Sequence, residues 1–321
     1  MRVAQFAPNF VRRNRRWILL RRTYHEGWTT AIKRYVLWSK ILRTRPFPVK
    51  PIESGAPVEV HLLCCEFDYL SAIWALKSFY YFARVRFPLA IHLQGWVPRR
   101  IIRRLRRHFP GARIITQPEA DTLVNDWLIS RRLERLRTLR RENFMMQKLV
   151  DFLLMCHAAR LLILDSDVLF FATPHHLLDA AHSTPNAAFF QLDPADNYNI
   201  SAEQALERFG IQLKPRINAG LALVPRDEVD LVRCEELASD NDVARSNGLV
   251  EQTLWALLTS ERIPVRHLPD SYLISLDPCC DVRDLIARHY AGPSRPLFTS
   301  EGVRALIEAG FLKKVNGQGQ H

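Results

Sequence analysis

The sequence predicts an α/β fold, in which short buried strands alternate with helices along most of its 321 residues. Apolar runs of strand length begin at residue 58 and recur near residues 89, 161 and 187. Segments of helix length, with apolar residues three or four positions apart, separate these runs. Hydrophobic residues make up 48% of the chain and charged residues 24%, so one large domain can bury a full core.

The expected elements follow one another in a regular order. After residue 50 come a strand at 58–64 with a helix at 71–83, a strand at 89–93 with a helix at 98–109, and a mostly helical stretch at 119–158. Later strands are expected at 161–164, 168–171, 187–192 and 221–224, and later helices around 227–238, 249–259 and 301–310. This alternation predicts a βα-layered sheet without internal repeats.

Residues 1–50 differ from the rest of the chain in charge. They contain 13 of the 45 Lys and Arg residues but one of the 33 acidic residues, so the remainder carries 32 of each and is neutral. The net charge of +12 therefore belongs to this segment, which argues against a whole fold built to grip nucleic acid. Apolar residues recur at helical spacing between Trp28 and Leu42, and three prolines between 46 and 51 end the pattern. We expect a basic amphipathic helical extension and linker at 1–50, a main domain at 51–312 and a polar tail at 313–321.

Two roles are open for the basic extension. A basic helix with several Trp residues suits an anionic membrane surface, and in the first role residues 1–45 make that contact. The alternative is a helix that packs on the main domain. Two further arginine-rich stretches, 99–108 and 131–141, place their aliphatic residues on one helical face, so their arginines are expected to be the solvated side.

The cysteines and the apolar pattern indicate the compartment. The six cysteines form two adjacent pairs and two single residues, without CxxC spacing, which argues against a disulfide framework and against structural zinc. The sequence shows neither a secretory signal pattern nor an apolar run long enough to cross a bilayer. We expect a cytoplasmic protein, peripheral to the inner face of the membrane if the extension binds lipid.

An acidic triplet, Asp165-Ser166-Asp167, stands at the end of an apolar strand in the segment LLILDSDVLFF. Residues i and i+2 of a strand point to the same side, so both carboxylates can converge on one hard cation such as Mn²⁺ or Mg²⁺. That cation would bind phosphate oxygens on its open side. The simpler alternative is a strand-to-turn junction whose Asp residues only meet solvent. The apolar flanks favour a ligand site, because open α/β sheets bind ligands at strand ends.

Five segments between residues 58 and 298 carry a family resemblance: HLLCCEFDYLSAIWALKSF, MMQKLVDFLLMCHAARLLILDSDVLF, RINAGLALV, LVEQTLW and HYAGPSRPLF. In this order they resemble the GT-A glycosyltransferases, particularly the retaining family 8 group that includes glycogenin and bacterial lipopolysaccharide galactosyltransferases. The resemblance implies a GT-A type Rossmann-like βαβ sandwich with a central mixed sheet. It also implies transfer of a hexose from a nucleoside-diphosphate sugar, with a UDP-sugar favoured, to a glycan, lipid-linked saccharide or protein.

The resemblance also implies a role for each matching residue. These roles are contact with the base for Tyr69, binding of the diphosphate for Lys148, Ser166, Gly292 and Arg295, contact with the donor sugar for Asn218, Ala219 and Gly220, catalysis for Gln252, Glu251 and Asp193, and metal ligation for Asp165, Asp167 and His289. Three positions depart from the family pattern, with Glu251 for Asp, Arg295 for Lys and Leu297 for Trp. Retaining and inverting mechanisms therefore both stay open, and in an inverting one Glu251 or Asp193 is the expected base.

Each matching residue also has an ordinary structural explanation. His289 could be an ordinary core or surface imidazole, Lys148 a solvated helix residue and Asn218 a turn former. Tyr69 reads equally as a packing residue.

Two other functions compete with sugar transfer. A haloacid-dehalogenase-like phosphatase would use Asp165 as its nucleophile and Asp167 as acid and base, but its motif usually starts the domain and needs a downstream lysine. A nucleic-acid-binding protein would use the basic N-terminus, although the sequence shows no recognisable nucleic-acid-binding motif.

Overall fold

The computed structural model describes residues 28–51, 56–182, 187–245, 247–279 and 281–317. The expectations for residues 1–27 and for residues 318–321 of the polar tail therefore lie outside the described residues. The strands are β1 (Val58–Cys64), β2 (Leu89–Leu93), β3 (Arg113–Ile115), β4 (Arg160–Leu164), β5 (Val168–Phe170), β6 (Ala188–Leu192), β7 (Ile217–Pro225), β8 (Val265–His267), β9 (Tyr272–Ile274) and β10 (Ala287–His289).

The α-helices are α3 (Trp28–Ser39), α4 (Tyr69–Ala83), α5 (Arg99–His108), α6 (Gln117–Ser130), α7 (Glu134–Glu142), α8 (Met146–Met155), α9 (His175–His182), α10 (Ala202–Phe209), α11 (Leu231–Ala238), α12 (Val250–Arg262), α13 (Arg295–Leu297), α14 (Arg304–Glu308) and α15 (Phe311–Gly317). Short 3-10 turns are η1 (Lys40–Arg43), η2 (Arg226–Glu228), η3 (Val282–Asp284) and η4 (Gly292–Ser294), and η5 (Phe298–Val303) is a π-helical turn. None of the helices in the described residues is long and apolar enough to span a bilayer.

Seven strands form a mixed central sheet in the order β3-β2-β1-β4-β7-β6-β8. The pairs from β3 to β4 are parallel, β7 is antiparallel to both β4 and β6, and β8 is parallel to β6. A second sheet has the order β5-β10-β9, with β10 antiparallel to β5 and parallel to β9. The predicted α/β fold with a mixed central sheet is confirmed.

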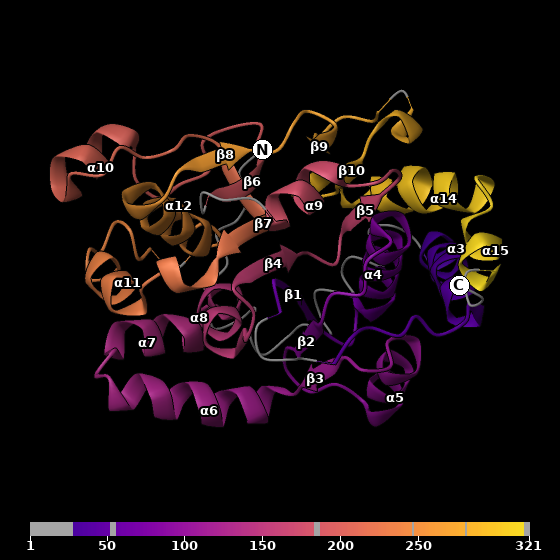
Figure 1. Cartoon of the computed structure of the whole chain (residues 1–321), viewed down its shortest axis with the longest axis horizontal. Helices are drawn as coiled ribbons and strands as arrows, with labels where there is room; N and C mark the ends of the chain where they lie inside the picture. The colour runs from indigo at the N-terminus through magenta and orange to yellow at the C-terminus, as the bar shows by residue number, and fades with distance from the viewer. Residues whose placement is uncertain (1–27, 52–55, 183–186, 246, 280, 318–321) are drawn as a thin grey trace.

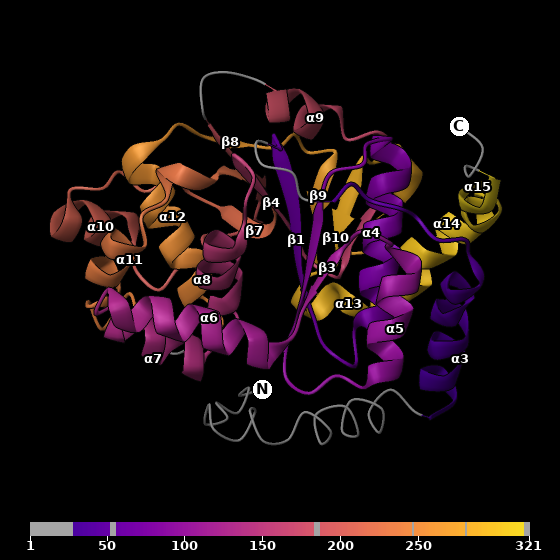
Figure 2. The same ribbon diagram turned by 60° about the horizontal axis from the view of Figure 1, so that its bottom comes forward.

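Helices cover both faces of the central sheet, as Figure 2 shows with α6, α7, α8, α11 and α12 on one side and α4 and α5 on the other. The strands create the two cores by alternation. In β4, for example, Leu162 and Leu164 join the core under α4, whereas Leu161 and Ile163 join the core under α8 and α12. The sheet is therefore buried on both faces, which explains its nearly continuous apolar strands.

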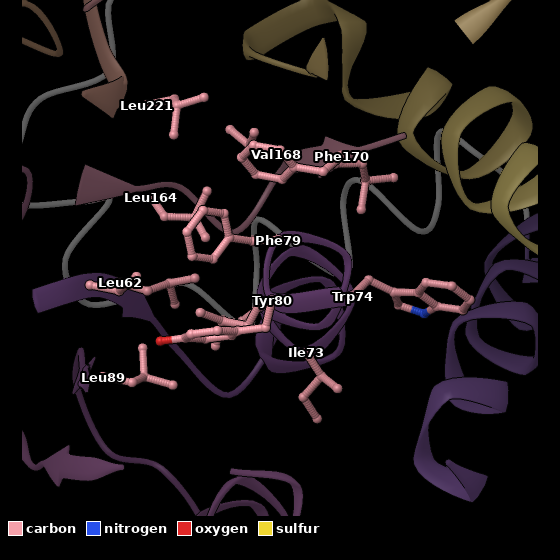
Figure 3. Packing of buried hydrophobic residues seen from close by; sticks show 14 of the residues in the cluster. Leu62, Ile73, Trp74, Phe79, Tyr80, Leu89, Leu164, Val168, Phe170 and Leu221 are labelled. Carbon is pink, nitrogen blue, oxygen red and sulfur yellow. The ribbon is translucent and has the colours of Figure 1, made fainter. Parts of the chain in front are cut away.

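Helix α4 is buried almost all round. Figure 3 shows Phe79 and Tyr80 turned toward Leu62 and Leu164 of the central sheet, while Trp74 points to the opposite side of the helix. A helix that is apolar on every side must be covered on every side. Here the central sheet, the strand β5 and the helix α3 provide that cover.

Helix α3 and the segment after it pack on the main domain. The indole nitrogen of Trp74 donates a hydrogen bond to the backbone oxygen of Trp38 at 2.9 Å. The buried Lys77 ammonium donates to Thr44 Oγ1 and to the backbone oxygen of Arg45, both at 2.6 Å, and burial lowers the pKa of Lys77 to about 7. The proline-containing stretch is thus fastened to α4. The division into 1–50, 51–312 and 313–321 remains a proposal, and α15 crosses its second boundary.

The two other arginine-rich stretches form α5 and α7, whose aliphatic residues face the core as expected. Ile101 and Leu105 of α5 are buried, as are Leu136 and Leu139 of α7. Arg140 differs from the expectation that the arginines are solvated, because its side chain is buried. It makes a bidentate contact with Asp151 at 2.6 and 2.8 Å and a further contact with Asp121.

A chain of polar side chains crosses the core beneath α8. Glu59 accepts hydrogen bonds from Arg113 at 2.7 Å and from the backbone of His157 at 2.8 Å, and it lies 3.3 Å from His61. His61 contacts His92 at 3.0 Å. Burial keeps the pKa of His61 below its ordinary value, so this imidazole is neutral and the full positive charge beside Glu59 is that of Arg113.

Replacing the Glu59 carboxylate should destabilise the fold in a pH-dependent way. Burial alone would raise the pKa of Glu59, but the contacts with His61, His157 and Arg113 lower it to about 2 from 4.5. The stabilisation is therefore complete above pH 4.5 and is lost as the pH falls toward 2. We expect Glu59→Gln to lower the free energy of unfolding by about 3 kcal/mol at pH 7 and by progressively less below pH 4.5. Urea unfolding at several pH values tests this, and a difference that stays constant with pH would contradict it.

Candidate active site

The acidic triplet forms the turn that connects the central sheet to the small sheet. The backbone N–H of Asp165, directly after β4, donates to the backbone oxygen of Gly220 at 2.7 Å. The backbone oxygen of Asp167, directly before β5, accepts from Tyr290 at 2.9 Å. Because β10 pairs with β5, His289 lies opposite Val168 and so beside the triplet.

Asp165, Asp167 and His289 converge on one point. Their ligand atoms all lie within 4.8 Å of one another. His289 Nε2 is 3.2 Å from Asp167 Oδ1 and 3.8 Å from Asp165 Oδ2. Asp167 Oδ1 is buried and has no hydrogen-bond partner within the described part of the chain. Two carboxylates and an imidazole fit a divalent cation such as Mn²⁺ or Mg²⁺, and such a cation would satisfy Asp167 Oδ1.

The charge state of Asp167 suits such a site. Burial would raise the pKa of this carboxyl, but His289 and Arg295 lower it well below its usual range. The group is therefore ionised at neutral pH despite its burial, as a metal ligand must be.

Two cations flank the triplet, each on a different carboxylate. Lys148 Nζ lies 2.8 Å from Asp165 Oδ1, and Arg295 Nε donates to Asp167 Oδ2 at 2.8 Å. Burial would lower the pKa of Lys148, but the nearby Asp165 and Glu251 raise it, so the ammonium stays charged. Lys148 is thus a buried residue of the site and not a solvated helix residue, whereas the Arg295 side chain is half exposed.

Gly220 makes room for His289. A Cβ atom built on Gly220 would lie 2.1 Å from His289 Cε1 and 2.6 Å from its Nδ1. No side chain is compatible with this approach, because contacts under about 3 Å between such atoms are repulsive. The NAG segment of β7 therefore positions the imidazole sterically.

A hydrogen-bonded chain leads from Gly220 to Asp193. Asn218 Oδ1 accepts from the backbone N–H of Gly220 at 2.9 Å, and Asn218 Nδ2 donates to Asp193 Oδ2 at 2.7 Å. Asp193 Oδ1 accepts from Asn197 Nδ2 at 2.6 Å. Asp193 is buried and Asn218 nearly so, and Ala219 is buried between its neighbours in β7. The tertiary structure thus joins the Asp193 carboxylate to β7 through Asn218.

Glu251 is a second carboxylate near Lys148. Its Oε1 atom is 4.0 Å from Lys148 Nζ, and this atom is buried without a hydrogen-bond partner in the described residues. Burial raises the pKa of Glu251 to about 7, with Lys148 opposing the shift and Asp165 adding to it. Gln252 Nε2 donates to the backbone oxygen of Asn197 at 3.1 Å, and the side chain of Asn197 in turn binds Asp193.

Three predicted residues remain: Ser166, Tyr69 and Gly292. Ser166 Oγ donates to Asp68 Oδ2 at 3.4 Å, and the Tyr69 hydroxyl accepts from Arg104 at 2.6 Å. Gly292 has a φ of +52°, in the left-handed region, and begins the turn between His289 and Arg295.

Sequence reasoning missed three polar residues of this region. Asp68 binds Ser166 and accepts from the backbone of Cys65 at 2.5 Å, Asn197 binds Asp193, and Arg104 binds Tyr69. Asp68 had a signal, because it follows the first strand at the ligand-binding end of the sheet. Asn197 and Arg104 had none, since only tertiary packing brings them here.

The sequence matches no protein-family model and no curated protein. The structure is similar to that of the galactosyltransferase LgtC in complex with donor and acceptor sugar analogues, with a TM-score of 0.51 at 15% identity over 82% of this chain and 96% of that chain. It is also similar to the apo structure of the WbbM bifunctional glycosyltransferase, with a TM-score of 0.52 at 15% identity over 86% of this chain and 52% of that chain. At such identity the likeness shows the fold, and it confirms the GT-A fold that the five segments predict.

Proposed function

We propose that this chain is a metal-dependent glycosyltransferase that moves a hexose from a nucleoside-diphosphate sugar to an acceptor. The observation that carries the proposal is the convergence of Asp165, Asp167 and His289 between the cations Lys148 and Arg295. Three side chains that could hold a divalent cation, with a basic side chain on each side, would suit two linked phosphates. It lies at the end of β4, where the sheet changes from parallel to antiparallel.

Asp165, Asp167 and His289 would hold Mn²⁺ or Mg²⁺, which stabilises the negative charge that develops on a leaving diphosphate. Lys148 and Arg295 would supply further positive charge to the phosphate oxygens. Both cations are already held beside the triplet by its carboxylates. Little reorganisation is then needed when the donor binds, because these groups are positioned beforehand.

The sugar would lie toward β7 and α12. Asp193 and Asn218 form a buried polar pair there that suits the hydroxyl groups of a hexose. Glu251 lies near Lys148, with a pKa raised by burial to about 7 and an unsatisfied oxygen. We favour retention of the anomeric configuration, in which Glu251 and Gln252 stabilise the sugar and a diphosphate oxygen takes the acceptor proton. Inversion, with Glu251 or Asp193 as the base, is the competing mechanism.

The proposal includes a nucleotide site at Tyr69, a UDP-sugar as the favoured donor, and a glycan or lipid-linked saccharide as the acceptor. A cytoplasmic location goes with it. Ser166, Ala219 and Gly292 are assigned to donor contact on their positions beside the cluster.

Donor binding should depend on the metal. We expect one class of nucleotide sugar, tested as UDP- and GDP-sugars, to raise the melting temperature with Mn²⁺ and not in excess chelator. At free donor about 100 times its Kd the stabilisation is about 2.7 kcal/mol, or roughly 4 °C for a protein of this size. The ¹H NMR spectrum of the product then reports the anomeric configuration. Equal stabilisation in chelator, or no response to any donor, would count against the proposal.

A further inference from the structure

A groove separates α3 from the segment 296–304, which directly follows Arg295. It has a volume of about 450 Å³ and is lined by Thr30, Lys33, Arg34, Leu37, Pro296, Thr299, Ser300 and Arg304. The lining contains three cations, and no carboxylate contributes to it in the described residues. The groove is a built feature, because Trp38 Nε1 donates to Thr299 Oγ1 at 2.9 Å and packs edge-on against Phe298 at 5.2 Å.

Beside this groove, α3 turns apolar side chains to solvent. Ile32, Tyr35 and Val36 are 60%, 54% and 55% exposed, and their spacing places them on one face of the helix. The inward face of α3 already packs on the domain through Leu37 and Trp38. The exposed apolar residues are therefore not needed for packing within the described chain.

Positive charge prevails around this apolar surface, although Arg304 lies 4.0 Å from Glu308 and both of these side chains are exposed. Residues 28–45 contain five Lys and Arg residues and no acidic residue. The acidic residue closest to the groove in sequence, Glu301, is paired with the buried Arg288 at 2.8 Å. We call the surface formed by Ile32, Tyr35 and Val36 with the groove cations Lys33, Arg34 and Arg304 the α3 face.

Helix α5 continues the same basic surface. Arg104 of α5 donates a hydrogen bond to the Tyr69 hydroxyl. Tyr35 of α3 also lies near Tyr69, because it contributes to the raised pKa of the Tyr69 phenol, to which burial contributes most. In both ribbon views α3 and α5 flank α4 at the same end of the molecule (Figures 1 and 2). Five arginines of α5 are exposed: Arg99, Arg100, Arg103, Arg106 and Arg107. The loop before α5 exposes 73% of Trp96.

We propose that the α3 face docks on an anionic lipid bilayer, with the groove cations on lipid phosphates and the exposed apolar residues at the headgroup boundary. A nucleic acid would use the cations but would leave Ile32 and Val36 in water, so the aliphatic residues favour lipid. The groove begins at Pro296, next to Arg295, which binds Asp167. Docking would therefore hold the reaction centre near the membrane surface. The inference does not rest on sugar transfer, because none of these residues belongs to the proposed catalytic cluster.

Vesicle flotation of the full chain tests the proposal. We expect binding to vesicles of phosphatidylglycerol with phosphatidylcholine, no retention on pure phosphatidylcholine, and weaker binding as salt rises. Lys33→Gln with Arg304→Gln should weaken binding about 30-fold at low salt, since each cation near the surface contributes about a fivefold factor. Ile32→Ser with Val36→Ser should weaken binding by at least about tenfold, including at higher salt.

Matched variants at the other end of the molecule serve as controls. Arg132→Gln with Arg141→Gln, just before and on α7, removes two exposed charges, and Leu206→Ser with Val232→Ser removes two exposed apolar residues. These controls should bind as the unchanged protein does. Failure of the full chain to float, or equal losses in test and control variants, would overturn the proposal. So would undiminished binding of the Ile32→Ser, Val36→Ser variant, and so would binding to single-stranded oligonucleotides but not to vesicles. Metal-dependent binding of the donor, measured on the same variants, should be unchanged and keeps this test separate from that of the proposed function.

Discussion

Asp167→Asn should abolish sugar transfer, with kcat falling by roughly 10³-fold or more while the protein remains folded. The substitution keeps the shape of the side chain but removes the charge that a divalent cation needs, and such a cation supplies several kcal/mol of charge stabilisation. Folding should survive, because Arg295 is half exposed and can turn to water when its partner is lost. Donor hydrolysis and transfer, each measured with and without Mn²⁺, report the effect.

The matched control for this variant is Asp126→Asn, an exposed carboxylate on α6. It should leave transfer, metal dependence and melting temperature unchanged. Full activity of Asp167→Asn, or of the unchanged protein in excess chelator, would contradict the proposed metal site. Release of phosphate from an aryl phosphate, abolished by Asp165→Asn, would favour the phosphatase alternative instead.

Gly220→Ala should displace His289 and weaken metal binding by about 10- to 100-fold, the range seen when the support of a metal ligand is lost. The added Cβ would lie 2.1 Å from His289 Cε1, so the imidazole or strand β7 must move. Overpacking of this kind also costs about 1–3 kcal/mol of stability. Isothermal titration with Mn²⁺ and thermal unfolding measure the two effects separately.

Gly248→Ala is the matched control, because a Cβ there meets nothing within 4 Å and its φ is not in the left-handed region. It should be neutral or slightly stabilising. The double variant Gly220→Ala, His289→Ala should regain most of the lost stability, since the clashing ring is gone, but should not regain metal affinity. Wild-type affinity in Gly220→Ala alone would remove His289 from the proposed metal site.

Both predictions depend on how Asp165, Asp167 and His289 are brought together. Asp165 and Asp167 come from one turn, whereas His289 reaches them because β10 pairs with β5 and because Gly220 has no side chain. The cluster is therefore assembled by strand pairing between the two sheets. A change that keeps every ligand but shifts β10 relative to β5 would damage it as much as the loss of a ligand.

Much of the fold could be predicted because its signals are local. The strands β1 and β2 occupy the predicted residues, since a five- to seven-residue apolar run between turn signals has few other solutions. Strands β3, β8, β9 and β10 were missed because each has three residues, which is too few to show a period. They exist because a neighbouring strand supplies their hydrogen bonds. Strand β5 is equally short, but its residues are all apolar and directly follow the acidic triplet.

The sequence by itself determined the α/β class, the strand-end placement of Asp165 and Asp167, and the separation of the basic N-terminal charge from a neutral body. These follow from periodicity and composition, which depend on residues near one another in the chain. Only the tertiary structure decided that Lys148 is buried against Asp165, that Gly220 admits His289, and that α3 packs with one face while exposing another. Those contacts join residues far apart in sequence, and only the register and packing of the completed fold determine which of them meet.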